Sequence, residues 1–129
     1  LIMVASKKMQ KIAAKLSRNL KKVIIIPNGI DTDLFYPNSK QDILRQELLG
    51  SHDYLLLSAG GLIPIKNHKV IIKAVKHLHN NDHNAKLIII GKGKLKSNLL
   101  KLASDLNISD SLEIIEFVDF IDMPKYYWI

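Results

Sequence analysis

The residues best suited to chemistry lie in a short glycine-containing stretch near the middle of the chain. Gly60 and Gly61 follow an apolar run over residues 54–59, and Lys66 precedes an apolar-periodic run that predicts a helix from Asn67 onward. Glycines allow a sharp turn and the close approach of a ligand. A helix N-terminus, which Asn67 is suited to cap, presents free N–H groups and a partial positive charge that favour an anion. The pattern, with the full charge of Lys66, predicts a phosphate site, although an ordinary strand-to-helix connection with a surface lysine has the same appearance.

A second glycine turn lies further along the chain, where Gly91 and Gly93 alternate with Lys92 and Lys94. From residue 54 the apolar patterns run strand, helix, strand, helix, strand, which is typical of a parallel sheet with helices on its faces. Such sheets bind ligands at the edge formed by the carboxyl ends of their strands. We therefore expect an α/β fold with both glycine turns at one edge. The expected strands cover residues 54–59, 86–90 and 112–118, and the expected helices cover residues 42–49, 67–79 and 95–106.

The net charge of +7 resides in the first 22 residues. This segment has seven basic residues and no acidic residue, whereas the rest of the chain has 12 of each. Ser6 is suited to cap a helix with an apolar stripe on one side and basic residues on the other. Such a helix either packs through its stripe or lies on an anionic membrane surface. The stripe consists of Met9, Ile12, Ala13, Leu16 and Leu20, and the basic residues on the opposite face are Lys8, Lys11, Lys15, Arg18 and Lys22. Lys7 and Lys21 complete the seven basic residues of the segment.

Several other kinds of site are disfavoured. The chain has no cysteine, which excludes disulfides and thiolate metal sites. His77, His79 and His83 are clustered, but zinc needs three or four ligands and polar residues break the helical spacing between them. Asp31 and Asp33 are expected to cap turns rather than bind a metal. No apolar run approaches the ~20 residues of a membrane span, and the basic helix lacks the interleaved aromatic residues that stack on nucleic-acid bases.

The order of several motifs resembles that of glycosyltransferase family 4. Residues 23–31, with the sequence VIIIPNGID, resemble the hinge signature of the family, which continues to Phe35 and Pro37. Three further segments resemble, in the same order, the loop that binds the donor diphosphate, the strand and loop that follow it, and the next strand with the start of its helix: residues 57–68, 86–95 and 117–127. Members of this family are GT-B enzymes with two Rossmann-like domains.

The resemblance implies a partial Rossmann-like parallel sheet with flanking helices, as part of a GT-B C-terminal domain. Residues 1–26 would be the last helix and strand of the N-terminal domain or interdomain region, residues 27–37 the hinge, and residues 38–129 an incomplete nucleotide-sugar-binding domain. Lys66 would contact the donor diphosphate, and Gly60 would allow its close approach. The other positions implied at the donor site are Gly61 in the same loop, Gly91 and Gly93 in the pocket wall, and Phe117 and Val118 near the base.

The implied function is the transfer of a sugar from a nucleotide-sugar donor to a glycan, lipid or other acceptor, as in polysaccharide or cell-envelope glycan synthesis. Members of the family usually retain the anomeric configuration and need no essential metal, so no cofactor is expected. The implied location is the cytoplasm, with peripheral contact between residues 7–22 and the anionic inner face of the membrane.

The chain also departs from the pattern of the family. Gly61 stands where the family usually has an arginine beside the lysine on the diphosphate, and glycine cannot supply a bidentate cation. Asp119 replaces a usual glycine. The two-glutamate motif of the family would lie beyond Ile129, so we expect no catalytic residue and little transferase activity in this chain alone. The alternatives are a degenerate, non-catalytic nucleotide-binding module and a basic piece that binds membrane surfaces.

Overall fold

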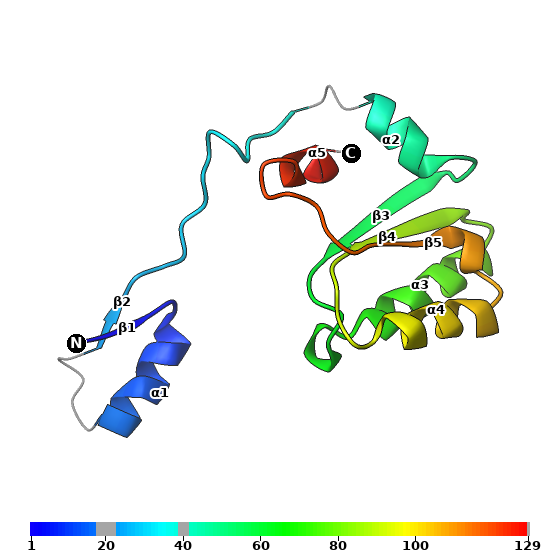
Figure 1. Ribbon diagram of the computed structural model, residues 1–129. Coiled ribbons are helices and arrows are strands. Elements are labelled where there is room, and N and C mark those ends of the chain that lie inside the picture. Colours follow the sequence, from blue (N-terminus) through cyan, green and yellow to red (C-terminus); the bar gives the residue numbers. More distant parts are fainter. Residues whose placement is uncertain (18–22, 39–41, 129) are drawn as a thin grey trace. The chain divides into compact units, whose positions relative to one another are not determined.

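The computed structural model describes residues 1–17, 23–38 and 42–128, which form two compact units (Figure 1). The first unit comprises Leu1–Phe35 and the second comprises Tyr36–Ile129. The point of division falls inside the segment 27–37, for which the sequence predicts a hinge.

The first unit contains two short strands and one amphipathic helix. β1 (Ile2–Val4) pairs in parallel with β2 (Val23–Ile25), and α1 (Lys7–Ser17) lies between them in sequence. Ser6 caps α1 as predicted, because its Oγ accepts a hydrogen bond from the Met9 N–H at 3.3 Å. Four residues of the predicted helix lie outside the described residues: Arg18, Leu20, Lys21 and Lys22.

The turn after β2 is held by an aspartate, as predicted. Oδ1 of Asp31 accepts hydrogen bonds from the backbone N–H groups of Asp33 at 3.0 Å and Leu34 at 3.2 Å. This carboxylate therefore organises local backbone, which accounts for its position without a metal ion.

The second unit is built on a parallel sheet with β4 (Ala85–Ile90) in the centre, flanked by β3 (Tyr54–Ala59) and β5 (Leu112–Ile115). The register pairs Ala59 with Ile90, and Ile90 with Ile115. All three strands therefore end at the same level of the sheet. A central parallel strand is buried on both faces and needs no polar alternation, and residues 87–90 of β4 are all buried.

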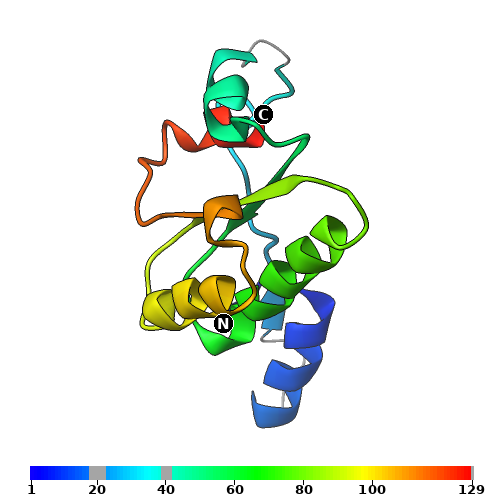
Figure 2. The same cartoon turned by 90° about the vertical axis from the view of Figure 1, so that its right-hand side faces the viewer.

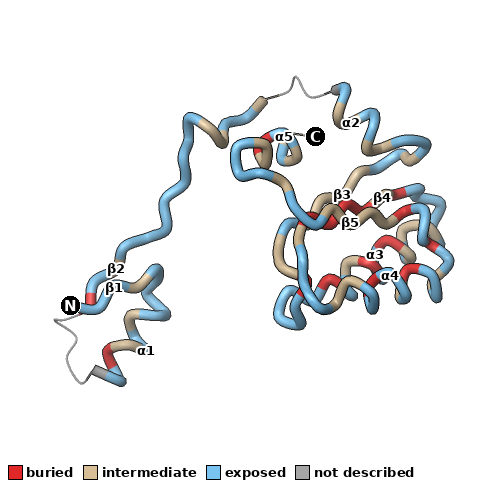
Figure 3. The backbone as a smooth tube through the Cα atoms, in the orientation of Figure 1, coloured by how far each residue is buried: buried red, intermediate tan, exposed pale blue. Residues whose placement is uncertain are grey.

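Helices cover both faces of this sheet. α3 (His68–His79) and α4 (Lys96–Asp105) lie on one face, and α2 (Asp42–Leu49) and α5 (Met123–Tyr127) lie on the other (Figures 1 and 2). Two 3₁₀ helices, η2 (Pro64–Lys66) and η3 (Ser109–Ser111), precede α3 and β5. The core lies between the sheet and the facing sides of α3 and α4 (Figure 3). Its buried members are Leu62, Ile72, Val75, Leu87, Ile89, Leu99, Ala103 and Ile108.

The predicted α/β architecture is confirmed, with one boundary that differs from the prediction by more than one residue. The third strand was expected over residues 112–118, but β5 ends at Ile115. The backbone oxygen of Ile115 accepts the N–H of Gly91 at 2.8 Å. Beyond this bond the chain leaves β4, because Gly91 itself turns away from the sheet.

Two of the three clustered histidines, His79 and His83, have structural partners. Nε2 of His79 lies 2.8 Å from the backbone oxygen of Ala85, and the ring of His83 packs edge-on against Tyr54 with centroids 5.8 Å apart. In the described part of the chain, no group of three His, Cys, Asp or Glu side chains could hold a metal ion. None of the described helices has the length and apolar character needed to cross a membrane.

Candidate functional site

Two glycine turns leave the carboxyl edge of the sheet next to each other. Because Ala59 and Ile90 are paired, Gly60 and Gly91 both follow the last residue of their strands. The N–H of Gly60 donates to the backbone oxygen of Ile90 at 2.8 Å, which joins the two turns at their start. We call residues 60–67 the first loop and residues 91–95 the second loop.

The two loops are hydrogen-bonded to each other beyond the sheet. The N–H of Leu62 donates to the oxygen of Lys92 at 3.0 Å, and the N–H of Leu95 donates to the oxygen of Leu62 at 3.3 Å. Leu62 is also completely buried in the core. The first loop is therefore anchored at its third residue, both by packing and by bonds to its neighbour.

This close contact explains why the second loop needs its glycines. A Cβ on Gly91, whose φ is +154°, would overlap the carbonyl oxygen of Gly60, and a Cβ on Gly93 would lie 2.5 Å from the oxygen of Leu62. Side chains at either position would push the loops apart. Gly91 and Gly93 therefore serve loop-to-loop packing, a role that their predicted place in the pocket wall did not include.

Lys66 is the cation of the first loop. It ends η2, and its aliphatic chain lies over Gly60, where a Cβ would be 3.4 Å from Cε of the lysine. Its side chain is exposed, and no ion pair joins it to an acidic residue in the described ranges. The ammonium group is therefore available to an anion at this edge.

Asn67 does not cap α3 in the way the sequence predicted. It has a left-handed backbone with φ of 52°, and its side chain makes no capping hydrogen bond. The backbone of Asn67 forms hydrogen bonds on both sides instead. Its N–H donates to the oxygen of Pro64 at 3.1 Å, and its oxygen accepts the N–H of Val70 at 2.9 Å. The prediction of a side-chain cap was therefore wrong, because η2 had already set the backbone at this residue.

A salt bridge between Lys96 and Glu116 lies next to the second loop. Nζ of Lys96, the first residue of α4, lies 2.6 Å from Oε1 of Glu116. This hydrogen bond and the charge of Lys96, with a smaller effect of Lys92, lower the pKa of Glu116 despite a slight opposing effect of burial. Glu116 is therefore ionised over a wider pH range than an ordinary glutamate, and it partly neutralises the lysines of this loop.

The remaining predicted positions follow β5. Phe117 is 70% exposed and Val118 is half-buried, and both belong to the segment that leaves the same edge. The structure thus brings Gly60, Gly61, Lys66, Gly91 and Gly93 together. The described contacts do not join Phe117 or Val118 to either loop.

Gly61, in contrast to its neighbours, has room for a side chain. A Cβ there would meet only the backbone oxygen of Lys92, at an ordinary contact distance of 3.7 Å, and the residue is not in the left-handed region. Its lack of a side chain is therefore not required by packing.

Sequence reasoning missed His68, the first residue of α3. It is buried, with 3% of its surface exposed, and its ring nitrogens lie 3.3 Å from Oγ of Ser58 and 3.3 Å from the backbone oxygen of Gly61. A signal was present, because Ser58 is the one serine in the apolar run 54–59 and its hydroxyl needs a polar partner when that strand is covered.

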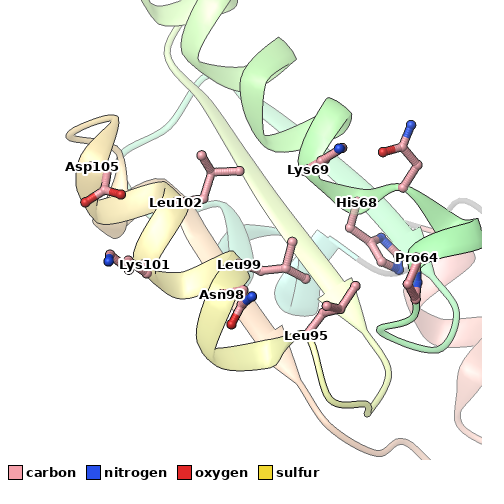
Figure 4. Close-up of a pocket in the computed structure, with 10 residues that line it drawn as sticks. Pro64, His68, Lys69, Leu95, Asn98, Leu99, Lys101, Leu102 and Asp105 are labelled. Atoms are coloured by element: carbon pink, nitrogen blue, oxygen red, sulfur yellow. The ribbon is translucent and has the colours of Figure 1, made fainter.

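A groove of about 630 Å³ lies between α3 and α4, on the face of the sheet that these two helices cover rather than at the sheet edge (Figure 4). Leu95, Leu99 and Leu102 form its apolar part, and Lys69, Lys101 and Asp105 are among its polar residues. It contains neither Lys66 nor any of the loop glycines, so we place the candidate site at the edge, where cation, glycines and strand ends converge.

Comparison with known proteins gives a consistent assignment. The family described as glycosyl transferases group 1 matches residues 39–129. A relative from Campylobacter jejuni, named N-acetylgalactosamine-N,N'-diacetylbacillosaminyl-diphospho-undecaprenol 4-alpha-N-acetylgalactosaminyltransferase, is 33% identical over 75% of this chain and 24% of its own length. A relative from Mycolicibacterium smegmatis, named GDP-mannose-dependent alpha-(1-6)-phosphatidylinositol monomannoside mannosyltransferase, is 25% identical over 79% of this chain and 27% of its own length.

A solved structure matches over almost the whole chain. The crystal structure of the pneumococcal O-GlcNAc transferase GtfA in complex with UDP and GlcNAc aligns with a TM-score of 0.73 and 18% identity, over 98% of this chain and 23% of that one. At this identity the likeness concerns the fold. The chain spans about a quarter of the length of the two curated relatives that it matches.

Proposed function

This chain belongs to the glycosyl transferases group 1 family, and from that premise we propose that its second unit binds the diphosphate of a nucleotide-sugar donor. The observation that carries the proposal is the pair of hydrogen-bonded glycine loops at one sheet edge, with Lys66, which forms no ion pair with a described residue, above Gly60. Glycines let a diphosphate approach the backbone, and the loops offer N–H groups to its oxygens.

We propose that the full enzyme transfers the sugar of this donor to a glycan or lipid acceptor. When the bond from the sugar to the diphosphate breaks, negative charge grows on the leaving diphosphate. Lys66, already placed at the edge, would offset that charge and so stabilise the transition state more than the ground state. This role needs no metal ion, and we expect EDTA to leave nucleotide binding unchanged.

We propose the chemical classes of the donor and the acceptor from the names of the relatives. One relative is named for GDP-mannose, and the pneumococcal structure contains UDP, so both nucleotides are candidates. Two relatives carry names that contain a lipid diphosphate or a phosphatidylinositol. We therefore propose a lipid-linked glycan of the cell envelope as the acceptor class.

The proposal is tested by adding UDP, GDP and inorganic pyrophosphate separately to the ¹⁵N-labelled chain. We expect saturable shifts of the amide signals of Gly60, Gly61 and Gly91, and smaller shifts elsewhere. Unchanged signals at these glycines with all three compounds would contradict donor binding. Binding without sugar transfer by the full-length enzyme would instead support the alternative of a non-catalytic nucleotide-binding module.

The substitution Gly61→Arg should strengthen nucleotide binding. The side chain fits without strain, and a guanidinium can bind a phosphate through two hydrogen bonds. A charge-assisted hydrogen bond contributes ~1.5–3 kcal/mol, so we expect about a tenfold or greater gain in affinity for UDP or GDP.

The matched control for this substitution is Gly29→Arg in the first unit, where a Cβ meets nothing within 4 Å and a side chain is equally free of overlap. It adds the same charge without placing it on the first loop. Equal gains from the two variants would mean that net charge, not a contact with the diphosphate, causes the effect. No gain from Gly61→Arg would mean that Lys66 already suffices.

As a second function, we propose that α1 contacts an anionic membrane surface. Met9, Ile12 and Leu16 are all exposed, and Leu16 is 82% exposed, so the described residues leave these three side chains of the apolar stripe uncovered. The basic residues of the described helix are Lys7, Lys8, Lys11 and Lys15. A helix with this pattern lies in the membrane interface through both its apolar and its basic sides.

Vesicle flotation tests this second function. The chain should float with phosphatidylglycerol vesicles at low salt and much less with phosphatidylcholine vesicles. Replacing the four lysines of α1 by glutamine should abolish flotation, because each basic residue near an anionic surface contributes about 1 kcal/mol. Failure of the unmodified chain to float at low salt would contradict the proposal.

A further inference from the structure

The imidazole of His68 joins the first loop to strand β3. Its Nδ1 lies 3.3 Å from Oγ of Ser58, and its Nε2 lies 3.3 Å from the backbone oxygen of Gly61. Because a carbonyl oxygen can only accept, Nε2 must carry a proton in this contact, and Nδ1 of the neutral ring accepts from the serine hydroxyl. His68 thus holds the Gly61 carbonyl toward the start of α3.

The peptide unit between Gly61 and Leu62 is restrained on both sides. The Gly61 oxygen also accepts the N–H of Ile63 at 2.9 Å, and the Leu62 N–H donates to Lys92 at 3.0 Å. The N–H of Gly61, by comparison, donates no backbone hydrogen bond to any residue that the structure describes. The Gly61 N–H is therefore available to a ligand, whereas the Gly61 oxygen is already hydrogen-bonded.

We infer that His68 is a positioning residue for the donor diphosphate, because it keeps the Gly61 carbonyl turned away from the anion. The inference rests on the proposed function and adds a second residue to it. Two consecutive glycines have an unusually free backbone, so a peptide unit in this loop can rotate unless something holds it. A rotated carbonyl would point a partial negative charge at the diphosphate, whereas in the observed orientation this oxygen is bonded to His68, and the Gly61 N–H and the Lys66 ammonium group remain available to an anion.

A matched pair of variants separates this role from packing. In His68→Gln the side-chain amide nitrogen reaches the position of Nε2 and can still donate to Gly61. In His68→Asn the shorter amide reaches only the position of Nδ1, so the Ser58 contact can be kept while the Gly61 contact is lost. Both variants are polar and of similar size, so their effects on folding should be alike.

The affinity of the full chain for pyrophosphate and for UDP is then measured by amide-signal titration, with thermal unfolding as the check on folding. We expect His68→Asn to weaken binding about tenfold, the effect of one hydrogen bond. His68→Gln should recover most of that loss. His79→Asn is the control, because His79 also bonds a backbone oxygen but at the other end of α3. It should lower the melting temperature without weakening the binding of either probe.

The outcomes distinguish the inference from the function on which it rests. If the unmodified chain binds neither probe, the proposed donor binding is wrong, and so is the inferred role of His68. If it binds both probes, and His68→Asn and His68→Gln bind equally well when folded, the inference alone is wrong. If His68→Asn does not fold, Ser58→Ala provides the second test. It removes the other restraint on the ring, should weaken binding in the same direction, and contradicts the inference if binding is unchanged.

Discussion

The variant Gly91→Ala should lose most of its stability, because the added methyl group has no space. Its Cβ would overlap the carbonyl oxygen of Gly60 and lie 2.8 Å from the carbonyl carbon, both of which are backbone atoms that can move only if the first loop shifts. Overpacking typically costs ~1–3 kcal/mol, and a left-handed backbone adds ~1–2 kcal/mol for a residue with a Cβ. We therefore expect the free energy of unfolding to fall by about 3 kcal/mol or more, measured by urea denaturation.

The matched control is Gly61→Ala, thirty residues away in sequence but beside the same contact between loops. Its Cβ would meet the oxygen of Lys92 at 3.7 Å, and its backbone is not left-handed. We expect its free energy of unfolding to stay within about 0.5 kcal/mol of the unmodified value, or to rise slightly as the unfolded chain loses freedom. Equal losses in the two variants would show that the loops separate easily and that their close contact is not essential.

The variant Lys66→Met should bind UDP and GDP about 10 to 150 times more weakly, as expected for the loss of a charge-assisted hydrogen bond. Methionine keeps an aliphatic chain over Gly60, so the packing of the first loop is retained while the charge is removed. Because the lysine is exposed, part of its effect should be screened by salt. Titration at low and at physiological salt should therefore give a larger difference at low salt.

Lys73→Met is the control for this variant. Lys73 is another exposed lysine, and it lies on α3 just beyond the first loop. Its replacement changes net charge equally but removes no cation from the loop, so we expect less than a twofold change in affinity at physiological salt, where distant charges are screened. Equal weakening by the two substitutions would mean that the nucleotide responds to overall charge and not to Lys66.

The sheet and the position of both glycine turns at one edge were predictable because the signals are strong and local. The continuous apolar runs that form β3 and β4 strongly predict buried strands. The alternation of strands and helices then implies that the strands pair in parallel. Since parallel strands share an edge, the position of Gly60 beside Gly91 followed directly. The resemblance to a glycosyltransferase family then gave these glycines and Lys66 their expected partner.

The features that were missed depend on contacts between segments distant in sequence. The role of Gly93 requires knowing that the oxygen of Leu62 lies beside it, which no local pattern contains. The Asn67 side chain does not cap α3 because Asn67 directly follows η2 and has a left-handed backbone there. No local sequence pattern predicts η2. The bond between His68 and Gly61 similarly requires the fold of the loop itself.

The hydrogen bonds between the two loops limit how donor preference can be transferred between related chains. A single residue inserted between Gly60 and Leu62 would break the match of Leu62 with both Lys92 and Leu95. Exchanging one loop with that of another protein should therefore give a poorly folded chimera, whatever the quality of the grafted segment. Residues 60–67 and 91–95 have to be exchanged together, as one module, in any attempt to recombine or redesign this chain.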